Sequence, residues 1–127
     1  MASLFSVPNL LLATDADWLF DDVAAALGGS FDVHRVRDGS DVTSAARTVD
    51  PELVILDLQI GNMGGVATSL LAKQEMGEGR MEDTPILLLL DREADVFLAE
   101  QSHADAWLVK PLNSLQLRRS ATELVEN

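Results

Sequence analysis

Five short apolar segments recur along the 127-residue chain, and each has the length of one β-strand. In chain order they read NLLLAT (9–14), FDVHRV (31–36), LVILDL (53–58), PILLLL (85–90) and AWLVKP (106–111). The third and fourth segments are almost continuously apolar, which is typical of strands that are buried on both faces of a sheet. The pattern therefore predicts a sheet whose centre is covered on both sides.

The segments between these strands carry apolar residues at helical spacing. Leu19, Val23 and Leu27 recur every four positions and predict one helical face. Three further apolar faces are predicted: Val42, Ala45, Ala46 and Val49; Val66, Leu70 and Leu71; and Leu117, Ala121 and Leu124. Strands and helices thus alternate along the chain.

Polar residues and glycines can define the helix ends. Asp15 or Asp17 can cap the first helix through its carboxylate, and the glycines at 28–29 can end it. Asn113 precedes Gln116 by three residues, which is close to a capping box at the start of the last helix.

The alternation of strands and helices predicts an α/β fold, because parallel strands are usually joined by helices. We expect a doubly wound, five-stranded parallel sheet of the flavodoxin-like order 2-1-3-4-5 with five helices. The length fits a single domain over residues 1–127. In such sheets a ligand site lies outside the carboxyl ends of the strands, where the strand order reverses.

Composition and charge narrow the range of functions. The chain has no cysteine, which excludes disulfides and thiolate metal sites. A formal net charge of -12 argues against direct contact with nucleic acid or an anionic membrane, since both would repel the chain. The apolar N-terminal segment is interrupted by Pro8 and Asn9, and it lacks the basic region and cleavage site of a signal peptide. We therefore expect a cytoplasmic protein.

Charged residues lie at the ends of four of the five predicted strands. Asp15, Asp57 and Asp91 end the first, third and fourth, and Lys110 ends the fifth. We expect these side chains to gather, because the carboxyl ends of parallel strands meet at one edge of the sheet. Gathered carboxylates must stay solvated, share protons or bind a cation, and a small oxygen site that keeps waters favours Mg²⁺ over Ca²⁺.

Other candidate chemistry is weaker. His34 and His103 are isolated in the sequence, which favours structural or solvated roles over a catalytic pair. The glycines in ALGGS and GNMGG do not have the spacing of a phosphate-binding loop, so a helix end and a tight turn explain them better.

Three motifs in this order resemble the receiver domain of two-component response regulators. PELVILDLQIGNMGG resembles the segment around the phosphorylated aspartate of that family, with Asp57 in its place. AWLVKPL resembles the fifth strand with its lysine, here Lys110, and LLLATDADWLFDDVAAAL resembles the first strand and helix. The resemblance covers residues 9–125.

The resemblance implies that Asp57 accepts a phosphoryl group from a histidine kinase, a phosphotransfer protein or a small donor such as acetyl phosphate. Asp15 and Asp57 would bind Mg²⁺ together with the backbone carbonyl of Gln59, and Lys110 would pair with the phosphoryl oxygens. No enzymatic activity is implied beyond the chain's own phosphorylation and dephosphorylation.

The chain departs from the family pattern at the end of its first strand. Thr14 replaces the first of two usual acidic residues, which predicts weaker Mg²⁺ binding because a hydroxyl is a poorer cation ligand than a carboxylate. Asp17 can compensate for the lost charge if the loop turns inward.

Three further departures bear on the phosphorylated state. Leu90 replaces a hydroxyl residue that bonds the phosphoryl group, and Asp91 places a negative charge where a small residue is usual. Trp107 occupies the place of a switching Tyr or Phe, and a buried indole would need a partner for its N–H. We therefore expect phosphorylation that is inefficient, short-lived or poorly transmitted.

The output is expected to be a protein contact, since the last predicted helix ends the chain and leaves no output domain. The face of the fourth helix, fifth strand and fifth helix is the candidate surface, with Phe97, Trp107, Leu112 and Arg118 as contacts, and it could also support a homodimer.

Two alternatives remain open on the sequence. One is a pseudo-receiver, an interaction module that does not use phosphorylation. The other is an enzyme that acts on a phosphorylated small molecule through an aspartyl phosphate, although Asp57 lacks the second aspartate two positions on that haloacid-dehalogenase-like phosphatases use.

Overall fold

The computed structural model describes residues 7–126, which form five strands and five α-helices. The strands are β1 (Asn9–Ala13), β2 (Asp32–Val36), β3 (Leu53–Asp57), β4 (Ile86–Leu90) and β5 (Ala106–Val109). The helices are α1 (Asp17–Leu27), α2 (Val42–Val49), α3 (Gly65–Gly77), α4 (Val96–Ser102) and α5 (Ser114–Glu126), with short 3-10 helices at η1 (Gly39–Asp41) and η2 (Glu93–Asp95). All strand pairs are parallel in the order β2-β1-β3-β4-β5, which confirms the predicted doubly wound, flavodoxin-like sheet.

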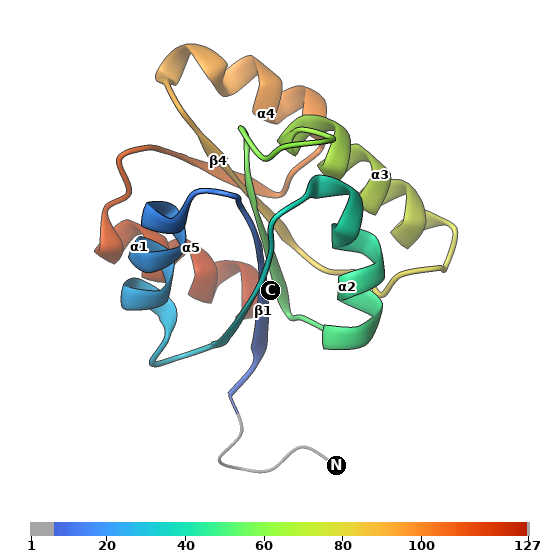
Figure 1. The fold of residues 1–127 in the computed structure, drawn as a ribbon, viewed down its shortest axis with the longest axis horizontal. Coiled ribbons are helices and arrows are strands. Elements are labelled where there is room, and N and C mark those ends of the chain that lie inside the picture. The colour runs from blue at the N-terminus through green and yellow to red at the C-terminus, as the bar shows by residue number, and fades with distance from the viewer. Residues whose placement is uncertain (1–6, 127) are drawn as a thin grey trace.

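Helices cover both faces of this sheet. Figure 1 shows α1 and α5 together on one side and α2 and α3 on the other. The alternation of side chains along each strand supplies two cores: Leu10 and Leu12 pack with α1 and α5, whereas Leu11 and Ala13 pack with residues of α2 and α3. Every residue of β3 and β4 is buried, as the continuous apolar segments predicted.

Helix α3 buries a different face from the one that its apolar residues predicted. Its buried residues are small, namely Gly65, Thr68, Ser69 and Ala72, whereas Leu70 is 40% exposed. The Ser69 hydroxyl donates a hydrogen bond of 2.8 Å to the carbonyl of Ser102, the last residue of α4. The prediction from apolar spacing was wrong because small residues allow α3 to pack close to its neighbours.

The predicted helix ends were correct at two of three places. Gly28 follows the last residue of α1, and Asn113 Oδ1 accepts a hydrogen bond of 3.0 Å from the Gln116 amide at the start of α5. Neither Asp15 nor Asp17 caps α1. Its N-cap is Ala16, whose amide instead donates to the Thr14 hydroxyl at 3.1 Å, so a residue of the strand end satisfies this group.

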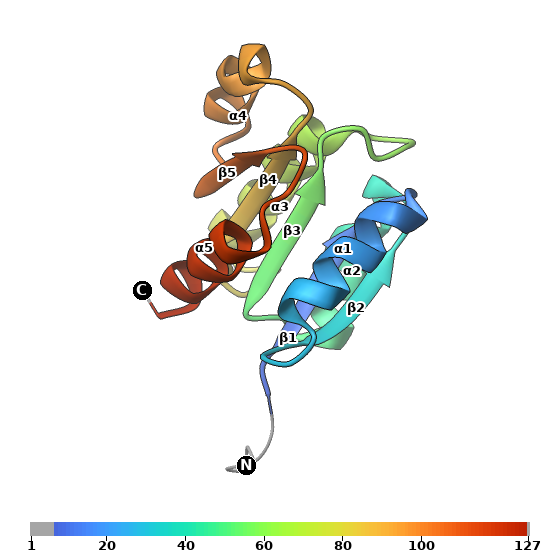
Figure 2. The same cartoon turned by 90° about the vertical axis from the view of Figure 1, so that its left-hand side faces the viewer.

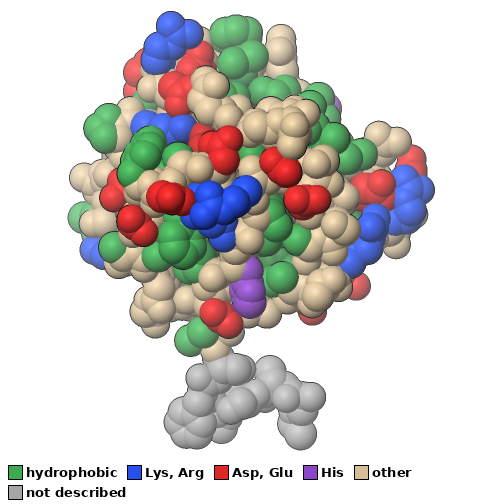
Figure 3. All heavy atoms as spheres, in the orientation of Figure 1, with side chains coloured by type: hydrophobic (Ala, Val, Ile, Leu, Met, Phe, Trp, Pro, Cys, Tyr) green, Lys and Arg blue, Asp and Glu red, His purple; other side chains and the backbone are tan. Residues whose placement is uncertain are grey.

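The surface carries many acidic side chains, in keeping with the net charge of -12. Figure 3 shows acidic and basic side chains interspersed on the face that it draws. None of the helices formed within residues 7–126 has both the length and the hydropathy of a membrane span.

Candidate functional site

Asp57 is the last residue of β3 and is only 2% exposed. Its Oδ1 accepts a hydrogen bond of 2.6 Å from Lys110 Nζ and one of 3.1 Å from the backbone amide of Gln59. Its Oδ2 accepts a hydrogen bond of 2.7 Å from the Thr14 hydroxyl. Both carboxylate oxygens are therefore bonded to protein donors, as a buried charge requires.

The sheet brings these residues together from distant parts of the chain. β1, β3, β4 and β5 are adjacent and parallel, so their carboxyl ends lie at the same edge (Figure 2). The Lys110 amide donates to the Leu90 carbonyl at 2.8 Å, which fixes the end of β5 beside the end of β4. The expected meeting of Asp57, Asp91 and Lys110 at this edge is thus found in the structure.

Lys110 lies between two carboxylates. Its Nζ donates to Asp91 Oδ1 at 2.8 Å as well as to Asp57, and its side chain is 11% exposed. Burial lowers the pKa of Lys110, but the hydrogen bonds and charges of Asp57 and Asp91 outweigh it, so this pKa lies above its ordinary value. The ammonium is therefore charged at neutral pH.

The pKa of the Asp91 carboxyl is shifted in the opposite direction from that of Lys110. Burial raises its pKa, but the hydrogen bonds from Lys110 and Gln59 and the charges of Lys110 and Arg92 outweigh that effect. The pKa of Asp91 consequently lies below its ordinary value, and the residue is a carboxylate at neutral pH.

Two side chains of this site were missed from the sequence. Gln59 was expected to contribute only a backbone carbonyl, yet its side-chain amide donates to Asp91 Oδ2 at 2.5 Å. Arg35, on β2, donates through Nε to the Thr14 carbonyl at 3.0 Å and so supports the residue that bonds Asp57. The positions of Gln59 two residues after Asp57, and of Arg35 near a strand end, were the available signals.

Asp15 lies beside the loop that follows Asp57. Its Oδ2 is 3.3 Å from the place that a Cβ atom on Gly61 would take. Within residues 7–126, no three side chains of His, Cys, Asp or Glu gather closely enough to hold a metal ion by themselves. The expected set of Asp15, Asp57 and the Gln59 carbonyl fits a hard cation by its oxygen chemistry, with two carboxylates rather than three.

Comparison with known proteins finds relatives of this chain. The chain is 32% identical over 108 residues to the sensory transduction protein BceR of Bacillus subtilis. The matched region is 83% of this chain and 44% of BceR. It is also 32% identical over 112 residues to the DNA-binding response regulator MtrA of Mycolicibacterium smegmatis. That matched region is 86% of this chain and 46% of MtrA. The chain is a receiver domain of the response-regulator family.

This receiver spans less than half the length of those two relatives. It matches no family model. Its fold is shared with the receiver domain of sensor histidine kinase PA1611 from Pseudomonas aeruginosa PAO1, with a TM-score of 0.83 and 18% identity over 96% of this chain and all of that one. That structure is described with a magnesium ion coordinated in its active-site cleft.

The residues that were expected to depart from the family pattern have different surroundings in this receiver. Leu90 is fully buried in the core between the sheet and α3 and α4. Trp107 lies on the edge strand β5 and is 39% exposed, so its indole does not need a buried partner. Asp17 is paired with Arg35 at 2.8 Å and Arg37 at 3.2 Å.

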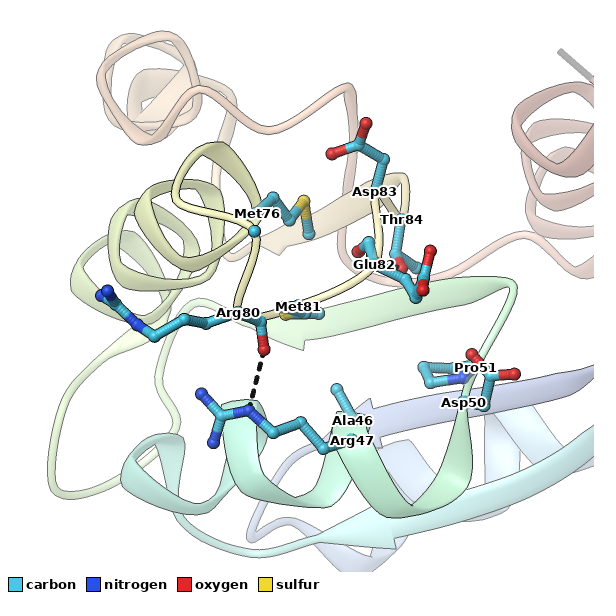
Figure 4. Close-up of a pocket in the computed structure, with 11 residues that line it drawn as sticks. Ala46, Arg47, Asp50, Pro51, Met76, Arg80, Met81, Glu82, Asp83 and Thr84 are labelled. Atoms are coloured by element: carbon cyan, nitrogen blue, oxygen red, sulfur yellow. Dashed lines mark hydrogen bonds between the residues drawn. The ribbon is translucent and has the colours of Figure 1, made fainter.

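A cavity of about 430 Å³ lies at the opposite end of the strands from Asp57, beside the segments that lead into β3 and β4 (Figure 4). Its lining includes Arg47 and Arg80, and Arg47 Nε donates to the Arg80 carbonyl at 2.9 Å. Both guanidinium groups pair with Glu75, which lowers their attraction for an anionic ligand. The chemistry of the strand ends around Asp57 is therefore the stronger candidate.

Proposed function

We propose that this receiver accepts a phosphoryl group on Asp57 from a phosphohistidine of a kinase or phosphotransfer protein, or from a small acyl phosphate. A carboxylate oxygen of Asp57 attacks phosphorus and forms the P–O bond of an acyl phosphate. The bond from phosphorus to the donor breaks, and its electron pair leaves with the imidazole or carboxylate of the donor.

The observation that carries the proposal is the 2.6 Å contact between Lys110 Nζ and Asp57 Oδ1. A fixed ammonium beside a nearly buried carboxylate can stabilise the negative charge that a phosphoryl group brings. The lysine comes from a different strand and lies at the carboxyl edge of the sheet, where ligand sites of this fold class occur.

Mg²⁺ is part of the proposal. Asp15, Asp57 and the Gln59 carbonyl would hold the ion, which when bound supplies positive charge to the phosphoryl oxygens. The presence of magnesium in the related receiver domain of PA1611 supports this choice of ion.

The test is incubation of the full chain with acetyl phosphate and Mg²⁺, followed by intact mass measurement. We expect the mass to rise by one phosphoryl group in the wild type and to stay unchanged in Asp57→Asn, which keeps the side-chain shape without the nucleophile. An unmodified wild type would contradict the proposal and favour a module that binds partners without phosphorylation.

The output is proposed to use the face formed by α4, β5 and α5. Phe97 and Trp107 are 56% and 39% exposed there, which is high for large apolar side chains and supports a role in contacting another protein or a second copy of the chain. The other two expected contacts lie toward α1: Leu112 packs on the core beneath α1 and α5, and Arg118 lines a hollow beside Asp22 and Ala25 of α1. Sedimentation velocity of the wild type and Phe97→Ala, before and after treatment with acetyl phosphate, would detect self-association through this surface.

A further inference from the structure

Lys110 is shared by two acidic residues in this receiver. Its Nζ donates to Asp57 Oδ1 at 2.6 Å and to Asp91 Oδ1 at 2.8 Å. Two of the three ammonium hydrogens are thus directed at carboxylates, and one positive charge is shared between two negative ones. A phosphoryl group on Asp57 would need the same ammonium.

Asp91 is held on Lys110 from two directions. The Gln59 side-chain amide donates to Asp91 Oδ2 at 2.5 Å, so both oxygens of this carboxylate have partners. The backbone is fixed as well, because the Lys110 amide donates to the carbonyl of Leu90, the residue before Asp91. Asp91 can therefore leave Lys110 by rotation of its own side chain, without movement of the backbone.

The Asp91 side chain can rotate toward solvent. The Asp91 side chain is 27% exposed, whereas that of Asp57 is 3% exposed, so solvent reaches the first carboxylate and not the second. A displaced Asp91 carboxylate can recover hydrogen bonds from water, which keeps the displacement feasible.

We propose that Asp91 is an internal anionic ligand of Lys110, which an incoming phosphoryl group must displace, and that the Gln59 side chain holds it in place. The inference rests on the proposed function, because it concerns regulation of the same site. Asp91 exchanges neither a proton nor a covalent bond in this step; it only gives up a hydrogen bond to Lys110. It is a positioning residue that sets how readily Asp57 is phosphorylated.

The test compares initial rates of phosphorylation by acetyl phosphate with Mg²⁺, measured by intact mass, at a donor concentration below saturation. Asp91→Ala should react about ten- to a hundred-fold faster than the wild type, the factor that one charge-assisted hydrogen bond is worth. Glu93→Ala is the matched control, since it removes an exposed carboxylate two residues away that makes no ion pair among residues 7–126. Its rate should stay within about twofold of the wild type.

A second variant separates release of Asp91 from loss of its charge. Gln59→Ala keeps the Asp91 carboxylate but removes its second partner, so the rate should rise by a smaller factor than in Asp91→Ala. On phosphorylation of the wild type, the side-chain NH₂ signals of Gln59 in a ¹⁵N spectrum should shift, because their acceptor moves away. The shift should be larger than in phosphorylated Asp91→Ala, where no acceptor is lost, and equal shifts would contradict the displacement of Asp91.

The outcomes distinguish the two proposals. If Asp91→Ala is phosphorylated no faster than Glu93→Ala while the wild type is modified, the inference is overturned and the proposed function stands. If neither the wild type nor either Asp91 or Gln59 variant is modified, the proposed function fails and the inference fails with it. Modification of Asp91→Ala but not of the wild type would support Asp91 as the group that withholds Lys110, and would overturn the proposal that the native chain accepts a phosphoryl group.

Discussion

Lys110 Nζ lies 2.6 Å from Oδ1 of Asp57, although 53 residues separate them along the chain. The contact joins the ends of two strands that are not adjacent, since β4 lies between β3 and β5. The lysine side chain therefore crosses the end of β4, where it also meets Asp91 at 2.8 Å. Its charge is the common partner of acidic residues from two strands.

Lys110→Met should lower the free energy of unfolding by about 1–3 kcal/mol, because the nearly buried Asp57 carboxylate loses its counter-charge. Urea unfolding at neutral pH would measure the change. In a double-mutant cycle, the same lysine substitution made on Asp57→Asn should cost less. Equal losses in both backgrounds would show that the two residues are not energetically coupled.

Thr14→Val should also destabilise the protein, by about 1–3 kcal/mol, since Thr14 is fully buried and its hydroxyl donates to Asp57 Oδ2 at 2.7 Å. The substitution preserves the side-chain shape, so the loss reports on the hydroxyl. Thr14→Ser keeps the hydroxyl and serves as the control in the same urea experiment. If valine proves no more destabilising than serine, the hydrogen bond contributes little.

Thr14→Asp should bind Mg²⁺ about tenfold more tightly than the wild type, because it adds a carboxylate ligand beside Asp15. Trp18 is 54% exposed near the start of α1, so its fluorescence can follow a titration with Mg²⁺. Thr14→Asn controls for side-chain size without charge. Wild-type affinity equal to that of the aspartate variant would refute weak binding by the threonine site.

Glu75 gives a pH dependence that is independent of the phosphorylation site. The hydrogen bond from Arg80 lowers the pKa of its carboxyl, partial burial opposes this, and the charges of Arg80 and Arg47 reinforce the lowering. A carboxyl with a pKa lowered on folding stabilises the protein above its unfolded pKa, and this stabilisation is lost as the pH falls through its folded pKa. The stability difference between the wild type and Glu75→Gln should thus be present at pH 6 to 7, roughly constant there, and shrink below about pH 4.

Urea midpoints of both proteins across this pH range would measure that difference. Glu82→Gln is the matched control, because Glu82 is exposed and forms no ion pair within the described part of the chain. A difference for Glu75→Gln that persists unchanged at low pH would show that the ion pairs with Arg80 and Arg47 do not cause it.

Gly65→Ala should destabilise the start of α3 by about 1–3 kcal/mol. A Cβ atom there would come within 2.8 Å of both the Asp57 carbonyl oxygen and the Leu58 Cα, and backbone atoms cannot easily move away. Gly77→Ala, in the last residue of the same helix, meets nothing within 4 Å and should be neutral or slightly stabilising. The Asp57 amide signal should shift in the first variant and not in the second.

The sequence was sufficient to predict the sheet because the strands are nearly uninterrupted apolar segments, and parallel order follows from the intervening helices. It also predicted that Asp15, Asp57, Asp91 and Lys110 lie at the same end of the sheet, since parallel strands end together, and Lys110 contacts Asp57 and Asp91 there. The roles of these residues in binding phosphate and Mg²⁺ remain predictions.

Other features depended on details that spacing does not encode. The hydrogen bond from the Gln59 side chain to Asp91 requires particular rotamers of both residues. The buried face of α3 was misjudged because Leu70 has the apolar character of a core residue, while the close contact with α4 favours Ser69 in that place. Spacing of apolar residues is a weak guide where small side chains decide how near two helices come.

The closeness of Asp15 to Gly61 bears on how such sites diverge among relatives. With Oδ2 of Asp15 only 3.3 Å from the place of a Cβ at position 61, a side chain there would require the carboxylate to shift by a few tenths of an ångström. Substitutions at these two positions should therefore covary in descendants of a common ancestor, with a bulkier residue at 61 tolerated where 15 is shorter.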